Sequence, residues 1–149
     1  EAAAEILERD YGVAAEVWSL TSINELQREG KRVQRWNLLH PEEPQKTAYF
    51  TEQLQGSDAP FVVATDYMKS FADQLRALCP VPYYVLGTDG FGRSDTRGKL
   101  REFFEVSREY VVLASLRSLS DAGSIPVARV IEARSALGID PDKPDPTTV

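Results

Sequence analysis

Two short runs of uninterrupted apolar residues, Phe61–Ala64 and Tyr83–Leu86, are the clearest signals in the hydrophobic pattern. Neither run alternates with polar residues, which is typical of strands that are covered on both faces of a sheet. Thr65 or Asp66 is the expected cap of a helix between the two runs. The apolar residues on one face of that helix are Met68, Phe71, Ala72, Leu75 and Leu78. A strand, a crossover helix and a second strand predict a right-handed parallel βαβ unit.

The chain upstream of this unit also shows helical and strand-like patterns. The first expected element is a helix that carries Ala3, Ile6, Leu7 and Tyr11 and ends at Gly12, followed by a strand near Ala15–Leu20. A second helix is expected to start at Thr21 or Ser22, with Ile23, Leu26 and Val33 on its inner face. A short helix is expected over Ala48–Leu54. Gly30 is a candidate interruption of the second helix. Because α/β domains usually begin on a strand, the helical start predicts that a first strand precedes this chain.

Three further helical patterns follow the second apolar run. The first is expected to open on Ser94 and Asp95 and to carry Leu100, Phe103 and Phe104. The second is expected to be capped by Ser107, with a hydrophobic staple between Val106 and Val111 and a core face of Val112, Leu113, Leu116 and Leu119. The third is expected to start at Pro126, with Val127, Val130, Ile131 and Leu137 turned inward. Residues 1–139 are therefore predicted to form one α/β domain. Residues 140–149 contain three prolines and predict a surface tail.

Composition and charge narrow the range of functions. The chain has 149 residues and a net charge of −6, which disfavours nucleic acid because phosphate binding depends on clustered Lys and Arg. No apolar run approaches the roughly 20 residues that a membrane-spanning helix needs. The single cysteine, Cys79, has no intrachain partner for a disulfide, and this favours a reducing, cytoplasmic setting in which it is a small buried hydrophobic residue.

Candidates for metal or acid–base chemistry are few. A structural zinc site needs four Cys or His ligands, but His40 and Cys79 are the only such residues in the sequence. His40 is the one side chain whose ordinary pKa lies near neutrality, and its place in a proline-bounded loop favours a structural role over catalysis. We therefore assign no catalytic residue and no metal ligand.

The glycine-rich segment Gly87-Thr88-Asp89-Gly90-Phe91-Gly92 carries the most information about function. Its Gly-x-x-Gly-x-Gly spacing reverses the dinucleotide-binding pattern, and it lacks the Lys-Ser/Thr pair of a phosphate-binding loop. The Asp-Gly step is similar to the start of the thiamine diphosphate motif, which requires an Asn some thirty residues downstream. Both asparagines of the chain, Asn24 and Asn37, lie upstream. We therefore predict no cofactor bound by this segment.

Asp66 and Asp89 each follow the carboxyl end of an apolar strand, the edge where ligands gather in open α/β sheets. A shared ligand-binding crevice is one interpretation. The other, which we favour, gives both residues local roles as a helix cap and a turn residue.

The segment from Val85 to Arg97 resembles the C-terminal, transketolase-like domain of the homodimeric bacterial pyruvate dehydrogenase family. Other segments that carry the resemblance are Glu1-Ala2-Ala3, Arg35-Trp36-Asn37, Leu39-His40-Pro41, Ala64 to Lys69, Phe104-Glu105-Val106 and Tyr110-Val111-Val112. The resemblance extends in order over nearly the whole chain.

This resemblance implies a mostly parallel five-stranded sheet flanked by helices, with the first strand missing from the chain. It also implies a much longer subunit that decarboxylates pyruvate and reductively acetylates lipoyl groups. Thiamine diphosphate and Mg²⁺ would be bound by other domains. The implied partners are those domains, a second copy of the subunit, and the dihydrolipoyl acetyltransferase component of the complex.

The residues from Gly87 to Ser94, namely Gly87, Thr88, Asp89, Gly90, Phe91, Gly92, Arg93 and Ser94, form our candidate interface loop. We expect Gly90 and Gly92 to permit close backbone approach to a neighbouring domain or subunit, and Arg93 to pair with an acidic residue there. The alternative is a free-standing module that binds a small molecule in the crevice near Asp66 and Asp89.

Overall fold

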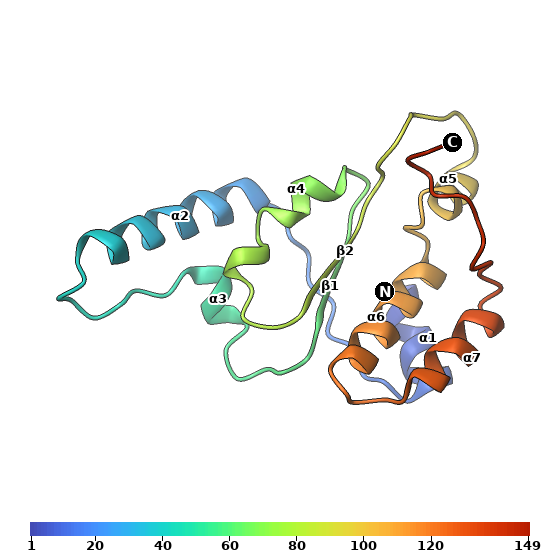
Figure 1. Cartoon of the computed structure of the whole chain (residues 1–149), viewed down its shortest axis with the longest axis horizontal. Helices are drawn as coiled ribbons and strands as arrows, with labels where there is room; N and C mark the ends of the chain where they lie inside the picture. Colours follow the sequence, from blue (N-terminus) through green and yellow to red (C-terminus); the bar gives the residue numbers. More distant parts are fainter.

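The structure is a computed structural model that describes all 149 residues. Its elements in chain order are α1 (Ala2–Tyr11), α2 (Ile23–Leu39), α3 (Tyr49–Gln53), β1 (Phe61–Ala64), α4 (Lys69–Asp73), the 3-10 helix η1 (Arg76–Leu78), β2 (Tyr83–Leu86), α5 (Arg97–Phe103), α6 (Arg108–Asp121) and α7 (Val127–Ala136). The two strands lie at the centre, with helices on both sides (Figure 1).

The strands β1 and β2 pair in parallel, with Phe61 opposite Tyr83 and Ala64 opposite Leu86. The chain passes from one to the other through α4 and η1, so the predicted parallel βαβ unit is confirmed. The N–H of Phe61 donates to the Pro82 carbonyl at 2.8 Å, and the N–H of Thr65 donates to the Leu86 carbonyl at 3.0 Å. Alternate residues of β1 thus bond to β2.

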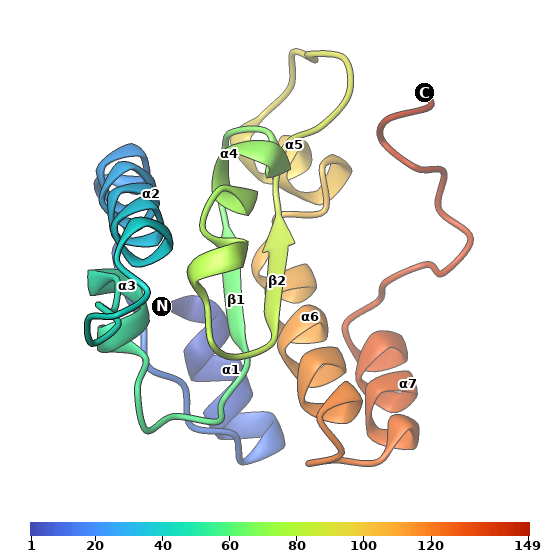
Figure 2. The same cartoon turned by 60° about the vertical axis from the view of Figure 1, so that its left-hand side comes forward.

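One face of the strand pair packs against α2, α3 and α4, and the opposite face packs against α6 (Figure 2). Val63, Tyr83 and Val85 belong to the larger core on the first face, whereas Leu86 contacts α6 residues on the second. Inside the larger core, the Tyr83 hydroxyl donates to the Ala72 carbonyl at 2.7 Å. Burial raises the pKa of this phenol well above its ordinary value.

A second core joins three helices outside the sheet. Leu7 of α1 meets Val112 and Leu116 of α6 and Ala133 of α7, and all four side chains are buried. The predicted helix at the N-terminus is confirmed, including its end at Gly12, which has a left-handed φ of 66°. Ser107 stands at the N-cap position of α6 as predicted, but its hydroxyl donates to the Glu109 carboxylate at 2.6 Å and makes no capping bond to the backbone.

The predicted strand over Ala15–Leu20 is wrong, because residues 12–22 have no regular secondary structure. This segment passes beside β1, but the backbone between Ala14 and Leu20 makes no hydrogen bond to another protein group. A strand exists only by pairing, so the apolar side chains are present here without the ladder that would define one. The resemblance implied a five-stranded sheet, and this chain forms two strands.

Several helix boundaries and faces also differ from expectation. The helix before β2 begins at Lys69, so neither Thr65 nor Asp66 caps it. Likewise, α5 begins at Arg97 and not at Ser94. On α7, Val127 and Ile131 are 56% and 51% exposed, and the small residue Ala133 faces the core in their place. Helix α2 continues through Gly30, where the missing side chain makes room for Leu78 of η1.

The residues after α7 fold back across the domain instead of leaving it. They run beside α6 and α5 to the end of the molecule that carries the glycine-rich loop (Figures 1 and 2). Pro146 is buried there. The expected surface tail therefore has a fixed contact with the loop, and it defines one side of the candidate site.

Substituting Gly87 by alanine should destabilise the fold by roughly 2 kcal/mol or more, because an added Cβ would overlap backbone atoms that cannot rotate away. It would lie 2.8 Å from both the Lys69 nitrogen and the Tyr67 oxygen. Gly98 is the matched control, since a Cβ there meets nothing within 4 Å and stands in a helix. Chemical denaturation should leave Gly98→Ala within about 1 kcal/mol of wild type. Equal stability of the two variants would contradict this packing.

Candidate functional site

The glycine-rich loop leaves β2 under tight constraint. Gly87 is buried against the backbone that connects β1 to α4. The N–H of Thr88 donates to the Tyr67 carbonyl at 2.9 Å, and its hydroxyl donates to the Asp66 carbonyl at 2.7 Å. The first residues of the loop are therefore tied to the segment that leaves the neighbouring strand, as expected where two parallel strands end at the same edge.

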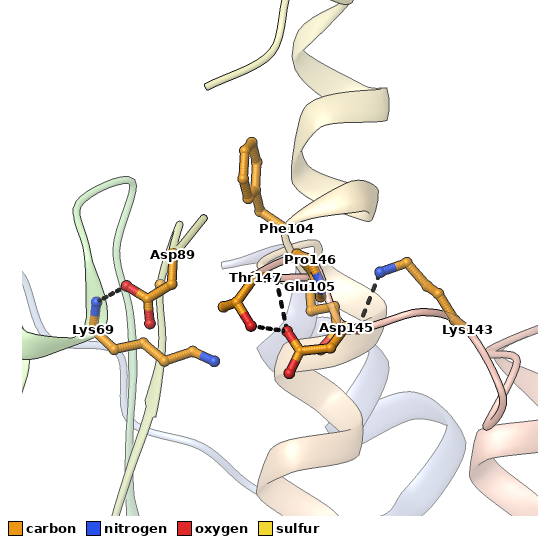
Figure 3. Close-up of a pocket in the computed structure, with 9 residues that line it drawn as sticks. Lys69, Asp89, Phe104, Glu105, Lys143, Asp145, Pro146 and Thr147 are labelled. Atoms are coloured by element: carbon orange, nitrogen blue, oxygen red, sulfur yellow. Dashed lines mark hydrogen bonds and ion pairs between the residues drawn. The ribbon is translucent and has the colours of Figure 1, made fainter. Parts of the chain in front are cut away.

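Asp89 has a local structural role. Its carboxylate accepts the backbone N–H of Lys69 at 3.0 Å, which satisfies a donor at the start of α4 (Figure 3). Asp66 is exposed, and one of its carboxylate oxygens lies 3.8 Å from the Arg101 guanidinium. The two aspartates line different pockets. The shared crevice that was one interpretation of these residues is thus not formed. Asp89 has a structural role, but not as the turn residue that we favoured, because its carboxylate accepts an N–H at the start of α4.

The C-terminal tail closes the other side of the loop. Gly90 has a φ of 106°, a backbone conformation that residues with a side chain rarely adopt. A Cβ at this position would collide with the Pro146 carbonyl oxygen and lie 3.3 Å from the Thr147 Cα. The close approach that we predicted for Gly90 is therefore made by this chain's own tail. The proline-rich sequence of the tail did not indicate that the tail would contact this loop.

A small polar pocket of about 210 Å³ lies between the loop and the tail (Figure 3). Lys143 contributes an ammonium group that pairs with the Glu105 carboxylate at 3.0 Å. The Asp145 carboxylate accepts both the N–H and the hydroxyl of Thr147, at 2.8 and 2.7 Å. These two hydrogen bonds, with smaller effects of Lys69 and Lys143, lower the pKa of Asp145. Lys143 and Glu105 thus pair with each other, and the carboxylates of Asp89 and Asp145 accept hydrogen bonds from uncharged donors.

The tip of the loop, by contrast, has almost no contacts within the chain. The Phe91 side chain is 79% exposed, and a Cβ on Gly92 would meet nothing within 4 Å. The Arg93 guanidinium lies 4.2 Å from the centre of the Phe103 ring. Every residue from Gly90 to Lys99 is exposed. The loop therefore has a fixed base, from Gly87 to Gly90, and a free tip, from Phe91 to Ser94.

An open pocket of about 480 Å³ lies between this tip and α5. Arg93, Arg97 and Arg101 line it, opposed by Asp66 and Asp95. The three arginines therefore do not form a purely positive site of the kind that binds phosphate, because carboxylates line the same pocket.

The two residues considered for reactivity are engaged elsewhere. A ring nitrogen of His40, Nδ1, donates to the Trp36 carbonyl at 2.9 Å, and the ring stacks on Trp36 with centroids 4.6 Å apart. His40 thus has structural contacts at the C-terminal end of α2, and its lack of a catalytic role stays a prediction. Burial raises the pKa of Cys79, so its thiol stays protonated at neutral pH.

Thiamine diphosphate and Mg²⁺ do not fit the residues of this loop. The carboxylate of Asp89, the one match to a thiamine-type motif, is held by the Lys69 amide. No group of three or more His, Cys, Asp or Glu side chains is arranged to hold a metal ion.

A second candidate site is the outer edge of β1. An open groove of about 410 Å³ separates β1 from the segment Glu16–Thr21, and most of its lining residues are apolar. Since Phe61 and Thr65 bond to β2, the alternation of a parallel ladder directs the N–H and C=O groups of Val62 and Ala64 into this groove. Neither residue has a backbone partner on that side. The groove is thus lined by unpaired backbone and apolar side chains.

Comparison with known proteins identifies the class of this domain. Residues 1–107 match the family model described as the transketolase-like TK C-terminal domain. The chain therefore belongs to the transketolase-like C-terminal domain family, and the resemblance inferred from the sequence is confirmed. In addition, none of the helices combines the length and the apolar composition that a membrane span requires.

Individual relatives are more specific. The pyruvate dehydrogenase E1 component of Pseudomonas aeruginosa is 52% identical over 147 residues, which is 98% of this chain and 17% of the relative. The proteins of the same name from Escherichia coli K12 and Cupriavidus necator are 50% and 48% identical, over 97% and 99% of the chain and 16% of each relative. The chain thus spans about a sixth of the length of these relatives.

Replacing Asp89 by alanine should lower the free energy of unfolding by about 1 kcal/mol, because the Lys69 N–H loses its acceptor. Asp89→Asn should cost less, since the amide oxygen can accept the same bond. Thermal or urea unfolding of both variants distinguishes this role from ligand binding. An alanine variant as stable as wild type would contradict the structural role.

Proposed function

We propose that this chain is the C-terminal domain of a thiamine-dependent pyruvate dehydrogenase, the first component of the pyruvate dehydrogenase complex, and that it serves as a scaffold and assembly domain. The observation that carries the proposal is identity near 50% along almost its whole length to pyruvate dehydrogenase E1 components. The geometry supports an assembly role, because the polar groups at the strand ends bind to each other and leave an exposed apolar tip.

In the full-length protein, thiamine diphosphate and Mg²⁺ bound by other domains would supply the chemistry of pyruvate decarboxylation. Lipoyl groups of the dihydrolipoyl acetyltransferase component would accept the acetyl group. The residues of this chain would act in neither step directly. The proposed setting is the cytoplasm, and the proposed partners are the remaining domains, a second subunit and the acetyltransferase component.

The tip of the candidate interface loop is the part that we assign to assembly. The phenyl ring of Phe91 is exposed at the end of a well-anchored loop, and burying it against a partner would remove apolar surface from water. Gly92 leaves space for another backbone to approach the tip. Arg93 adds a cation beside Phe91 that can meet an acidic residue of the partner.

Phe91→Ala in the full-length protein should weaken association of the subunits by roughly tenfold or more, since a buried aromatic side chain is a frequent interface hot spot. Stability within the subunit should change little, because the ring is 79% exposed. Leu38, which is 78% exposed on α2, provides the control Leu38→Ala. Sedimentation equilibrium and the rate of pyruvate decarboxylation are the measurements.

Gly92→Val extends this test to the backbone. It should weaken association by excluding a neighbouring chain, although a Cβ meets nothing in the domain itself. Dimerisation and activity that are unchanged in both loop variants would rule out the loop as an interface.

The outer edge of β1 supports the second half of the proposal, a sheet that is completed by a strand from elsewhere in the longer polypeptide. Unpaired backbone groups along an open strand edge are a ready template for pairing with another strand. The groove separates β1 from Glu16–Thr21, so one inserted strand could pair on both sides. The predicted strand at Ala15–Leu20 would then form by pairing with the inserted one, and the sheet would approach the five strands of the family.

Ala64→Pro tests this strand directly. Proline removes an N–H that faces the groove, which an edge strand tolerates but an internal strand does not. In the 149-residue chain, the substitution should change the unfolding free energy by about 1 kcal/mol or less, whereas in the full-length protein the loss should be about 3 kcal/mol. Val63→Pro, whose N–H faces β2, should be destabilising in both. An equally mild effect of Ala64→Pro in both proteins would argue against an inserted strand.

A further inference from the structure

The C-terminal tail is attached to both flanks of the free loop tip. On one flank, Pro146 and Thr147 cover Gly90, the last residue of the fixed base. On the other flank, the Lys143 ammonium donates to the carbonyl of Phe103 at 2.8 Å, at the end of the helix that follows the tip. The tip from Phe91 to Ser94 therefore lies between two points that one short segment holds.

The contact at Gly90 is a steric seat. The glycine combines a φ of 106° with a missing side chain, and the Pro146 carbonyl occupies the space that a Cβ would take. Pro146 is buried although the residues on either side of it are exposed. Its place is stabilised by a turn in which the Asp145 carboxylate accepts the Thr147 N–H. The end of the tail is thus preformed to meet the loop.

The contact at α5 is electrostatic. The Lys143 ammonium bonds to Glu105 at 3.0 Å as well as to the Phe103 carbonyl, and both charged side chains are partly buried. Glu105 has a φ of 61°, the one left-handed conformation at a residue other than glycine. Because that conformation is unfavourable for a residue with a Cβ, the turn between α5 and α6 depends on such contacts to keep its shape.

We propose that the C-terminal tail, residues 140–149, is a clamp that holds the glycine-rich loop in its partner-binding conformation. The proposal rests on the assembly function proposed for the loop tip. With the tail in place, Gly90 and α5 fix the ends of the tip, and little conformational entropy remains to be lost on association. Without the tail, the segment from Gly90 to Thr96 has few contacts within the domain and becomes free to move.

The test uses the full-length protein with two changes that release the tail, a deletion of residues 140–149 and Lys143→Met. Lys99→Met, at an exposed lysine of α5 that has no ion pair, is the matched control. The two measurements are subunit association and the rate of tryptic cleavage after Arg93. Both are measured over a dilution series from assembled protein to single subunits. Protection of the cleavage site by a partner subunit can then be distinguished from protection by the tail.

Lys143→Met should speed cleavage of single subunits after Arg93 and weaken association, each by about tenfold, while Lys99→Met changes neither. The deletion should have the larger effect. Cleavage that stays at the wild-type rate in both tail variants would overturn the clamp. Faster cleavage with unchanged association would support the clamp and contradict the interface assigned to the loop tip, so the two proposals can fail separately.

Discussion

The unpaired backbone groups along the outer edge of β1 are the constraint on which the rest of this structure depends. Two parallel strands cannot form an independently stable sheet, so the pair relies on helices against both faces and on whatever meets its free edge. The helices are present: α2, α3 and α4 enclose one side, and α6 covers the other. The edge at Val62 and Ala64 instead opens into an apolar groove. This is the edge that the proposed inserted strand would fill.

At the glycine-rich loop, the polar groups at the strand ends are engaged in contacts within the domain. Thr88 and Asp89 bind to the segment that leaves β1, and Gly90 is covered by the tail. What remains at the surface is an aromatic tip next to arginines. The strand ends hold ligands in many α/β proteins, and here they carry the loop tip to which we assign contact with another protein surface.

The sequence predicted those features whose causes are local. Phe61–Ala64 and Tyr83–Leu86 are continuous apolar runs between turn residues, and both are strands. The strand predicted at Ala15–Leu20 failed because pairing depends on a neighbour that the pattern cannot reveal. For the same reason, the importance of Gly90 was predicted but its contact with Pro146 was not. On α7, hydrophobicity alone predicts Val127 and Ile131 in the core, although the close approach of α6 there favours Ala133.

The most direct measurement is residue-resolved hydrogen exchange at the amides of Val62 and Ala64, in this chain alone and in the full-length protein. In the chain alone, both amides should exchange much faster than that of Thr65, which bonds to Leu86. In the full-length protein, all three should be protected to a similar degree, because an added strand pairs with the outer edge of β1. Rapid exchange at Val62 and Ala64 in both proteins would mean that the edge is never filled, and it would contradict this account.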